Sequence, residues 1–222
     1  VGSEMCIRDS MKRIFSIISA LGCVLSVSAQ DYYTGRDQVS ADGITFSVSV
    51  YQGLILSLSN IANTRGDAPE VYKDGSPIEP EFEEYAVANT VPGCVEKAFT
   101  ETFTQEEYEM LKQDPTANID IGYIISPQGV TEEVSFVMDY APCMLRIPPA
   151  KYALLEKNLK RYVKWDVNLF GRKLQFMHGI SFANFSKIRL QYPSSEPEIP
   201  DLTVPTVPLN PGDEELKPAP WN

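Results

Sequence analysis

The amino-acid sequence predicts an α+β fold: an antiparallel sheet with one main helix, in the order strand–turn–strand–helix–strand, preceded by a β-hairpin and a short helix. Three observations predict it. Two stretches of alternating apolar and polar residues, 44–50 and 54–59, are separated by a short loop that contains glycine. A second such pair, 119–125 and 130–138, is separated by a four-residue turn. One long amphipathic segment, 148–163, follows.

The first half of the chain is expected to contribute the hairpin and the short helix. Every second residue from Ile44 to Val50 is apolar, which is typical of a strand with one buried face. Residues 63–80 are rich in Asn, Gly, Asp and Pro and indicate a loop. The sequence Thr104-Gln-Glu-Glu107 has the spacing of a capping box, so it predicts a helix that begins there and runs to about Lys112.

The second half is expected to hold the main helix and the end of the sheet. The helix begins at Pro148-Pro149, since a first helical turn tolerates proline, and its apolar residues recur on one face. Gly171 marks a loop, after which residues 173–185 predict the last strand of the common pattern. Residues 186–192 are a candidate for one more strand that would close the sheet.

Domain organisation follows from these elements. Residues 30–192 are expected to form one α+β domain, with a division into 30–112 and 119–192 as the alternative. Residues 193–222 contain eight prolines and six acidic residues but one lysine, which predicts an acidic, Pro-rich disordered tail. A free tail, a linker to a further domain and a Pro-rich ligand for a partner stay open as interpretations.

The beginning of the chain predicts export. Residues 1–10 resemble a translated sequencing adapter, and 11–29 have the basic start, apolar centre and small-residue end of a signal peptide. We expect cleavage between Ala29 and Gln30, with a lipoprotein attached through Cys23 as the alternative. The apolar run is shorter than the about 20 residues that a membrane helix needs, so no stable span is expected after cleavage.

Composition narrows the classes of partner. The chain has a formal net charge of −11, and its Lys and Arg residues are outnumbered by Asp and Glu. Binding of nucleic acid depends on clustered basic residues that neutralise phosphates, so nucleic acid is not an expected partner. An anionic membrane surface is disfavoured for the same reason. A protein partner in the cell envelope is the expectation that remains.

Two of the four cysteines, Cys94 and Cys143, lie outside the predicted adapter and signal segments. An even number of cysteines in an oxidising compartment makes them a candidate disulfide. A bridge between Cys94 and Cys143 would close the loop between these two residues. In the chain-entropy description, closing that loop would stabilise the fold by about 4 kcal/mol. Two free, buried thiols are the alternative.

The sequence contains no motif that indicates a catalytic or metal-binding site. His178 is the only histidine, so any histidine-dependent triad would rest on it alone. No zinc-type cluster, phosphate-binding glycine loop or nucleophile elbow occurs. Adjacent carboxylates, such as Glu106-Glu107 and Glu132-Glu133, point in different directions on a regular element. Loop aspartates lie near glycines but do not match the EF-hand spacing. We therefore predict no catalytic residue, no metal ligand and no cofactor.

Part of the sequence is similar to the C-terminal domain of TonB-type energy transducers. The residues that carry the resemblance are Ile119-Asp-Ile-Gly-Tyr-Ile-Ile125, the hairpin arm 130–137, Val163-Lys164-Trp165 and the last strand through Phe185. The resemblance implies a sheet edge that accepts an extended partner segment as an added strand. The chain departs from that family because its leader is of the cleavable type and its Pro-rich segment follows the folded part.

Two functional hypotheses follow. The chain, which also resembles small exported proteins of the Gram-negative envelope, is expected to be a non-catalytic protein of the periplasm or the secreted fraction. In this hypothesis it binds a protein partner or joins an assembly through a sheet edge. The alternative is a small secreted hydrolase that uses carboxylates, for example on glycans.

Overall fold

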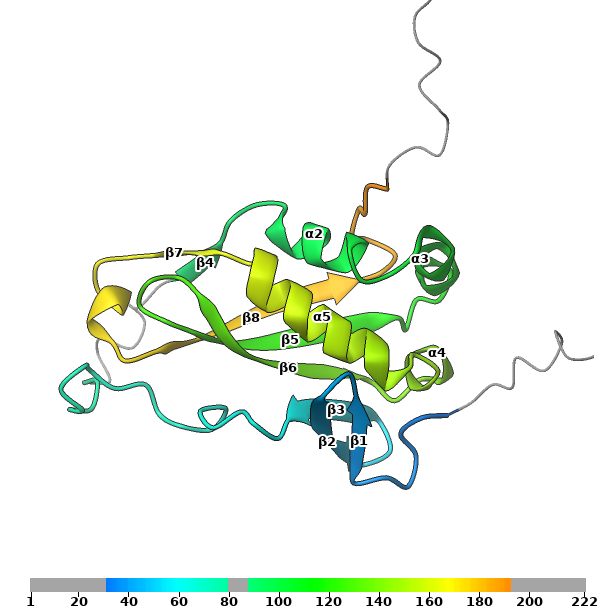
Figure 1. Ribbon diagram of the computed structural model, residues 1–222, viewed down its shortest axis with the longest axis horizontal. Coiled ribbons are helices and arrows are strands. Elements are labelled where there is room, and N and C mark those ends of the chain that lie inside the picture. The colour runs from blue at the N-terminus through cyan, green and yellow to red at the C-terminus, as the bar shows by residue number, and fades with distance from the viewer. Residues whose placement is uncertain (1–30, 80–87, 193–222) are drawn as a thin grey trace, which may run out of the picture. The chain divides into compact units, whose positions relative to one another are not determined.

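The computed structural model describes residues 31–79 and 88–192. Six strands form one antiparallel sheet in the order β1-β2-β3-β6-β5-β8 (Figure 1). These strands are β1 (Gln38–Ala41), β2 (Ile44–Tyr51), β3 (Ile55–Asn60), β5 (Asn118–Ile125), β6 (Thr131–Asp139) and β8 (Met177–Asn184). A two-stranded sheet pairs β4 (Ala88–Thr90) with β7 (Trp165–Val167). The helices are α2 (Cys94–Thr100), α3 (Gln105–Lys112), α4 (Pro142–Leu145), α5 (Pro149–Tyr162) and the 3₁₀ turn η2 (Gly171–Lys173).

The predicted α+β fold is confirmed. Both predicted hairpins, the short capped helix and the main helix are present, close to their predicted bounds. β3 of the first half pairs with β6 of the second half, so both halves contribute to one sheet. The predicted adapter, the signal peptide with Cys23 and the Ala29–Gln30 cleavage site, and the tail 193–222 lie outside the described residues.

Local chemistry explains the hairpins and the short helix. Asp42 and Gly43 join β1 to β2 with positive φ angles of 50° and 81°, the conformation in which Asp-Gly is favoured in a two-residue hairpin loop. The capping box of α3 forms as predicted, because the Thr104 side chain accepts the Glu107 N–H and the Glu107 carboxylate accepts the Thr104 N–H. Each such cap contributes about 1 kcal/mol to helix stability.

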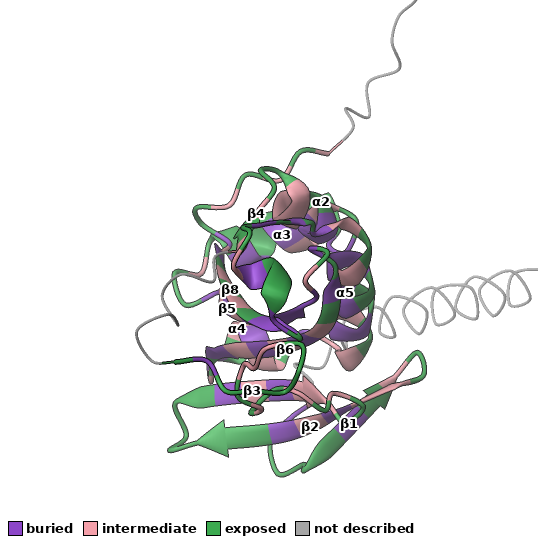
Figure 2. Cartoon of the chain, turned by 90° about the vertical axis from the view of Figure 1, so that its left-hand side faces the viewer, coloured by how far each residue is buried: buried purple, intermediate pink, exposed green. Residues whose placement is uncertain are grey.

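The hydrophobic core lies between one face of the sheet and the helices. α5 crosses that face of β5 and β6 (Figure 1), and its Leu155 and Leu159 are fully buried against residues such as Ile121 and Phe136. Figure 2 shows the buried residues gathered along α5 and the strands that face it. Glu156 of α5 forms an ion pair with Lys160 at 2.6 Å, and its side chain is buried. In the described residues, no helix has the length and apolarity to cross a membrane.

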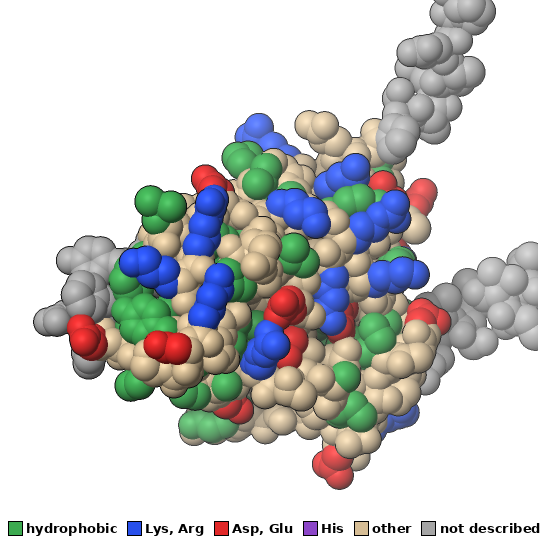
Figure 3. All heavy atoms as spheres, turned by 60° about the vertical axis from the view of Figure 1, so that its left-hand side comes forward, with side chains coloured by type: hydrophobic (Ala, Val, Ile, Leu, Met, Phe, Trp, Pro, Cys, Tyr) green, Lys and Arg blue, Asp and Glu red, His purple; other side chains and the backbone are tan. Residues whose placement is uncertain are grey.

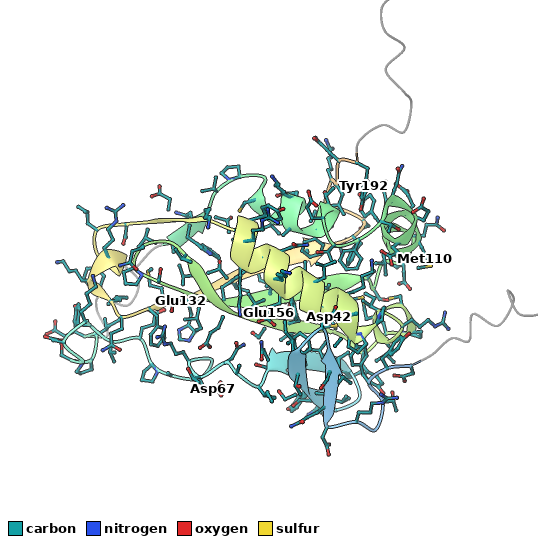
Figure 4. The ribbon with its side chains drawn as sticks, in the orientation of Figure 1. Asp42, Asp67, Met110, Glu132, Glu156 and Tyr192 are labelled. Carbon is teal, nitrogen blue, oxygen red and sulfur yellow. The ribbon has the colours of Figure 1, made fainter. Side chains whose placement is uncertain are left out.

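The strand predicted at 186–192 is wrong. After β8 the chain turns, because the N–H groups of Lys187 and Ile188 both donate to the Asn184 carbonyl. The Tyr108 hydroxyl of α3 then donates to the Ile188 carbonyl at 2.7 Å, and Tyr192 packs against Tyr108 beside α3 (Figure 4). The alternating apolar residues of this segment therefore pack beside the helix α3 instead of forming a strand. Among the described strands, the sheet ends at β8.

The disulfide predicted from the sequence between Cys94 and Cys143 stays a prediction. Cys94 lies at the start of α2 and Cys143 in α4, and both are half-buried. The Cys143 sulfur lies 3.6 Å from the Thr116 hydroxyl, just before β5 begins.

Candidate functional site: the free edge of β8

β8 pairs with β5 on one side only, and no described strand pairs with its other side. In an antiparallel pair, alternate residues point their N–H and C=O groups toward the partner strand and away from it. The Phe185 N–H donates to the Ala117 carbonyl in the same register, so the odd-numbered residues of β8 bond to β5. The even-numbered residues, which include Ile180 and Phe182, therefore point their backbone groups outward.

The first half of this outer edge is covered. The His178 N–H donates to the Glu70 carboxylate at 2.6 Å, and just before β8 the Gln175 N–H donates to the Val71 carbonyl at 2.9 Å. At the other end the Asn184 carbonyl accepts from the turn that follows. Between these two points, the backbone groups of Ile180 and Phe182 have no partner in the described part of the chain. We call this stretch, Gly179–Ala183, the free edge.

The side chains of the free edge are distributed in the reverse of the usual pattern. The residues that face the core are small, namely Gly179, Ser181 and Ala183, whereas Ile180 and Phe182 face solvent with 59% and 70% of their surface exposed. Large apolar residues normally occupy the buried face of a strand. An apolar pair beside unpaired backbone groups is the surface that another strand can cover.

Packing from β5 and β7 explains why the inward positions are small. A Cβ atom at Gly179 would lie 2.5 Å from the Ile125 side chain and 2.9 Å from the Trp165 ring. The Trp165 ring in turn packs edge-on against Tyr123, with ring centroids 5.0 Å apart. The Ser181 hydroxyl lies 2.8 Å from the hydroxyl of the buried Tyr123, so each group has a hydrogen-bond partner. The core therefore has room for small residues only at these positions of β8.

A groove runs beside the free edge. It has a volume of about 480 Å³ and lies between Ser181, Phe182 and Asn184 on one side and the segment 90–96, with Lys187 and Ile188, on the other. A chain laid along the edge would direct alternate side chains onto Ile180 and Phe182 and into this groove, because strand side chains alternate between faces.

One carboxyl group adjoins the apolar pair. Asp120 on β5 lies directly opposite Phe182. Burial and the negative charge of Asp139 raise the pKa of Asp120 above its ordinary value. Asp139 in turn accepts a hydrogen bond from the Asn118 amide at 3.0 Å. The surface next to Phe182 is therefore a poor place for a second acidic group.

The carboxylate pairs noted in the sequence are engaged in structural contacts. Glu132 pairs with Arg65, and Figure 4 places it on β6. Glu133 accepts the N–H groups of Thr64 and Arg65 at 3.0 and 3.1 Å. Glu107 caps α3 and pairs with Lys151 at 2.6 Å.

His178, the only histidine, sits at the covered end of the edge with its Nδ1 3.3 Å from Glu70. Sequence reasoning did not single out Ile180 or Phe182. The contrast between Gly179-x-Ser181-x-Ala183 and the two large residues between them was the signal that could have found them.

Basic side chains are concentrated elsewhere. α5 turns Lys157, Arg161 and, just past its end, Lys164 to solvent. Figure 3 shows Lys and Arg side chains gathered over one face of the molecule, with a few acidic ones among them. The charge on the α5 face is thus opposite in sign to the net charge of the chain.

Comparison with known proteins places the fold but not the activity. No protein-family model matches the chain, and no curated protein matches it either. Among solved structures, it is similar to a DUF5043 family protein from Bacteroides uniformis, determined by crystallography at 1.85 Å resolution. The TM-score is 0.55 and the identity 19%, and the alignment covers 74% of this chain and 94% of that chain. At this identity the likeness concerns the fold alone.

Proposed function

We propose that this chain is an exported, non-catalytic protein of the Gram-negative envelope that binds an extended segment of a protein partner along the free edge of β8. The observation that carries the proposal is the reversed pattern of β8, with Ile180 and Phe182 exposed beside unpaired backbone groups. Export rests on the signal-type segment 11–29. The resemblance of 119–185 to TonB C-terminal domains supports the same mode of binding.

The proposed mechanism is strand addition. The partner backbone would exchange hydrogen bonds with the outward N–H and C=O groups of Ile180 and Phe182, which supply affinity without sequence specificity. Apolar partner side chains would cover Ile180 and Phe182, and burying side chains of this size contributes about 1.5–3 kcal/mol each. The carboxyl groups of Asp120 and Asp139, which lie near Phe182, disfavour an acidic partner residue opposite Phe182.

In the described residues, no hollow on the surface holds a carboxyl group of raised pKa, which the hydrolase alternative requires. A carboxylate hydrolase needs two acidic groups across a cleft, one of them with a raised pKa. In the described residues, Asp120 is the carboxyl group whose pKa is raised, and it does not line any of the hollows on the surface described here. We therefore do not assign a reaction to this chain.

Site-specific photo-crosslinking tests the proposal. A photoreactive phenylalanine analogue replaces Phe182 in the full chain, which is produced with its own leader in a Gram-negative host. Leu54, an exposed apolar residue on the β2–β3 hairpin with 66% of its surface exposed, carries the analogue in the matched control. We expect a discrete crosslinked protein from position 182 that is absent from position 54. Identical products from both positions, or no product from position 182, would contradict the proposal.

A further inference from the structure

The face of the sheet that points away from α5 carries a group of small polar residues. Ser47 of β2 lies opposite Ser59 of β3, Ser59 opposite Ser135 of β6, and Ser135 opposite Gly122 of β5. Ser57 lies two residues before Ser59 and faces the same side. Serine is not a favoured strand residue, and large or branched side chains usually cover such a face. Because these side chains are small, they leave a depression in the centre of this face.

The loop segment 63–67 lies along one side of this depression and forms its wall. The Asn63 amide donates to the Val134 carbonyl at 2.8 Å, which fastens the loop to β6. The Glu133 carboxylate accepts the N–H groups of Thr64 and Arg65, which fixes the next two residues. Asp67 follows on the same segment (Figure 4). These anchors make the wall part of the folded structure.

The sheet and the loop enclose a hollow of about 340 Å³. This volume falls in the range of about 300–1,000 Å³ that small-molecule sites occupy. The polar residues that line it are Ser57, Ser59, Asn63, Asp67, Glu133, Ser135 and His178. Gly122 and Gly179 bring backbone close to the surface, and Ile124 supplies an apolar part.

Several polar atoms of the lining are free to bind a ligand. The hydroxyls of Ser57, Ser59 and Ser135 and the carboxylate of Asp67 have no hydrogen-bond partner in the described part of the chain. Each hydroxyl can donate one hydrogen bond and accept others, whereas the carboxylate only accepts. Glu133 already accepts hydrogen bonds from neutral groups of the loop, so Asp67 is the carboxylate of the lining that has its oxygens open to a ligand.

The lining selects a class of ligand. No Lys or Arg lines the hollow, so nothing there would compensate an anion. A purely apolar ligand would leave the serine hydroxyls without water or partners, which is costly. A neutral ligand with several hydroxyl groups can donate to Asp67 and exchange hydrogen bonds with the serines. We propose that this hollow binds a sugar residue of a glycan. The site adjoins the free edge, because Gly179 belongs to both and Ile180 lies opposite Gly122, but its lining includes neither Ile180 nor Phe182. The sugar proposal does not depend on the proposed strand addition.

Titration of the isotope-labelled full chain by nuclear magnetic resonance tests this site. The probes are the methyl glycosides of glucose, galactose and N-acetylglucosamine, and putrescine serves as a cationic probe. We expect at least one glycoside to shift the amide signals of Gly122, Ser135 and His178. A response to putrescine alone, or to none of the probes at about 50 mM, where even millimolar ligands saturate their site, would overturn the proposal.

Variants separate the hollow from a non-specific surface. Replacing Ser57 and Ser135 together with alanine removes two hydroxyls, and we expect affinity for the responding glycoside to fall at least about tenfold. Ser49→Ala is the matched control, because Ser49 faces the same side of the sheet but does not line the hollow. Alanine fits at each position, so an unchanged spectrum verifies folding. Equal affinity in the double variant and the control would refute the site.

Discussion

β1 and β8 are the two edge strands of the same sheet, and they differ in length and in the side chains that they expose. β1 has four residues, and the side chains that it turns to the open face, Gln38 and Ser40, are polar. β8 has eight residues and exposes Ile180 and Phe182. Short, polar edge strands are how soluble proteins avoid pairing with other chains. In the described residues, β1 is therefore a short edge with polar side chains, whereas β8 is a longer edge with an exposed apolar pair.

The largest expected effect concerns the reversed pattern of β8. In Gly179→Val the new side chain would meet Ile125 and Trp165 inside the core, so we expect a loss of about 1–3 kcal/mol in the free energy of unfolding. Ile180→Ser, one residue away, should change it by less than about 0.5 kcal/mol because Ile180 is exposed. Urea unfolding followed by tryptophan fluorescence measures both. Similar losses for the two variants would show that β8 is not oriented as described.

The second expected effect separates the two edges in binding. Phe182→Lys places a charge on the free edge, and we expect it to weaken binding of the crosslinked partner at least about tenfold, since an apolar contact is replaced by a charge that must be desolvated. Ser40→Lys makes the same addition on β1 and should leave binding unchanged. Pull-down of the purified partner with each variant provides the comparison. If Ser40→Lys weakens binding as much, the partner uses β1 or the whole surface.

The sequence predicted the strongly patterned elements and missed the short ones. The alternation from Ile44 to Val50 located β2, and the capping box at Thr104 located α3, because these signals are local. β7 has three residues and is defined by distant pairing, as when the Trp165 N–H donates to the Gly129 carbonyl at 3.2 Å. The residues next to β7 in the sequence give no indication of which distant residues it pairs with.

The free edge could not be predicted for a related reason. The alternation of Ile188, Leu190 and Tyr192 is real, but those residues pack on the core beside α3 instead of extending the sheet. A strand there would have covered β8. Which strand ends a sheet is decided by competition between distant packing partners, and one sequence does not show the result.

The smallest expected effect concerns Asp120 beside the free edge. Its pKa is raised by burial and by Asp139, so the folded state favours its protonated form. The group therefore stabilises the fold below its unfolded-state pKa, and that contribution is lost as pH rises through the raised pKa. Asp120→Asn should be more stable than the parent chain at pH 7 by a few tenths of a kcal/mol, because Asp120 is largely solvent-screened.

Thermal unfolding at pH 7 and at pH 3 measures this difference. The advantage of Asp120→Asn should shrink at pH 3, where Asp120 in the parent chain is protonated. An advantage that persists unchanged at pH 3 would show that the charge on Asp120 is not its cause.

Amide hydrogen exchange at β8 tests strand addition at the free edge. In the free chain, the outward N–H groups of Ile180 and Phe182 should exchange much faster than those of Gly179 and Ser181, which bond to β5. When the crosslinked partner segment is bound, we predict that exchange at Ile180 and Phe182 slows at least about tenfold. Unchanged exchange at these two amides in the complex would contradict strand addition at β8.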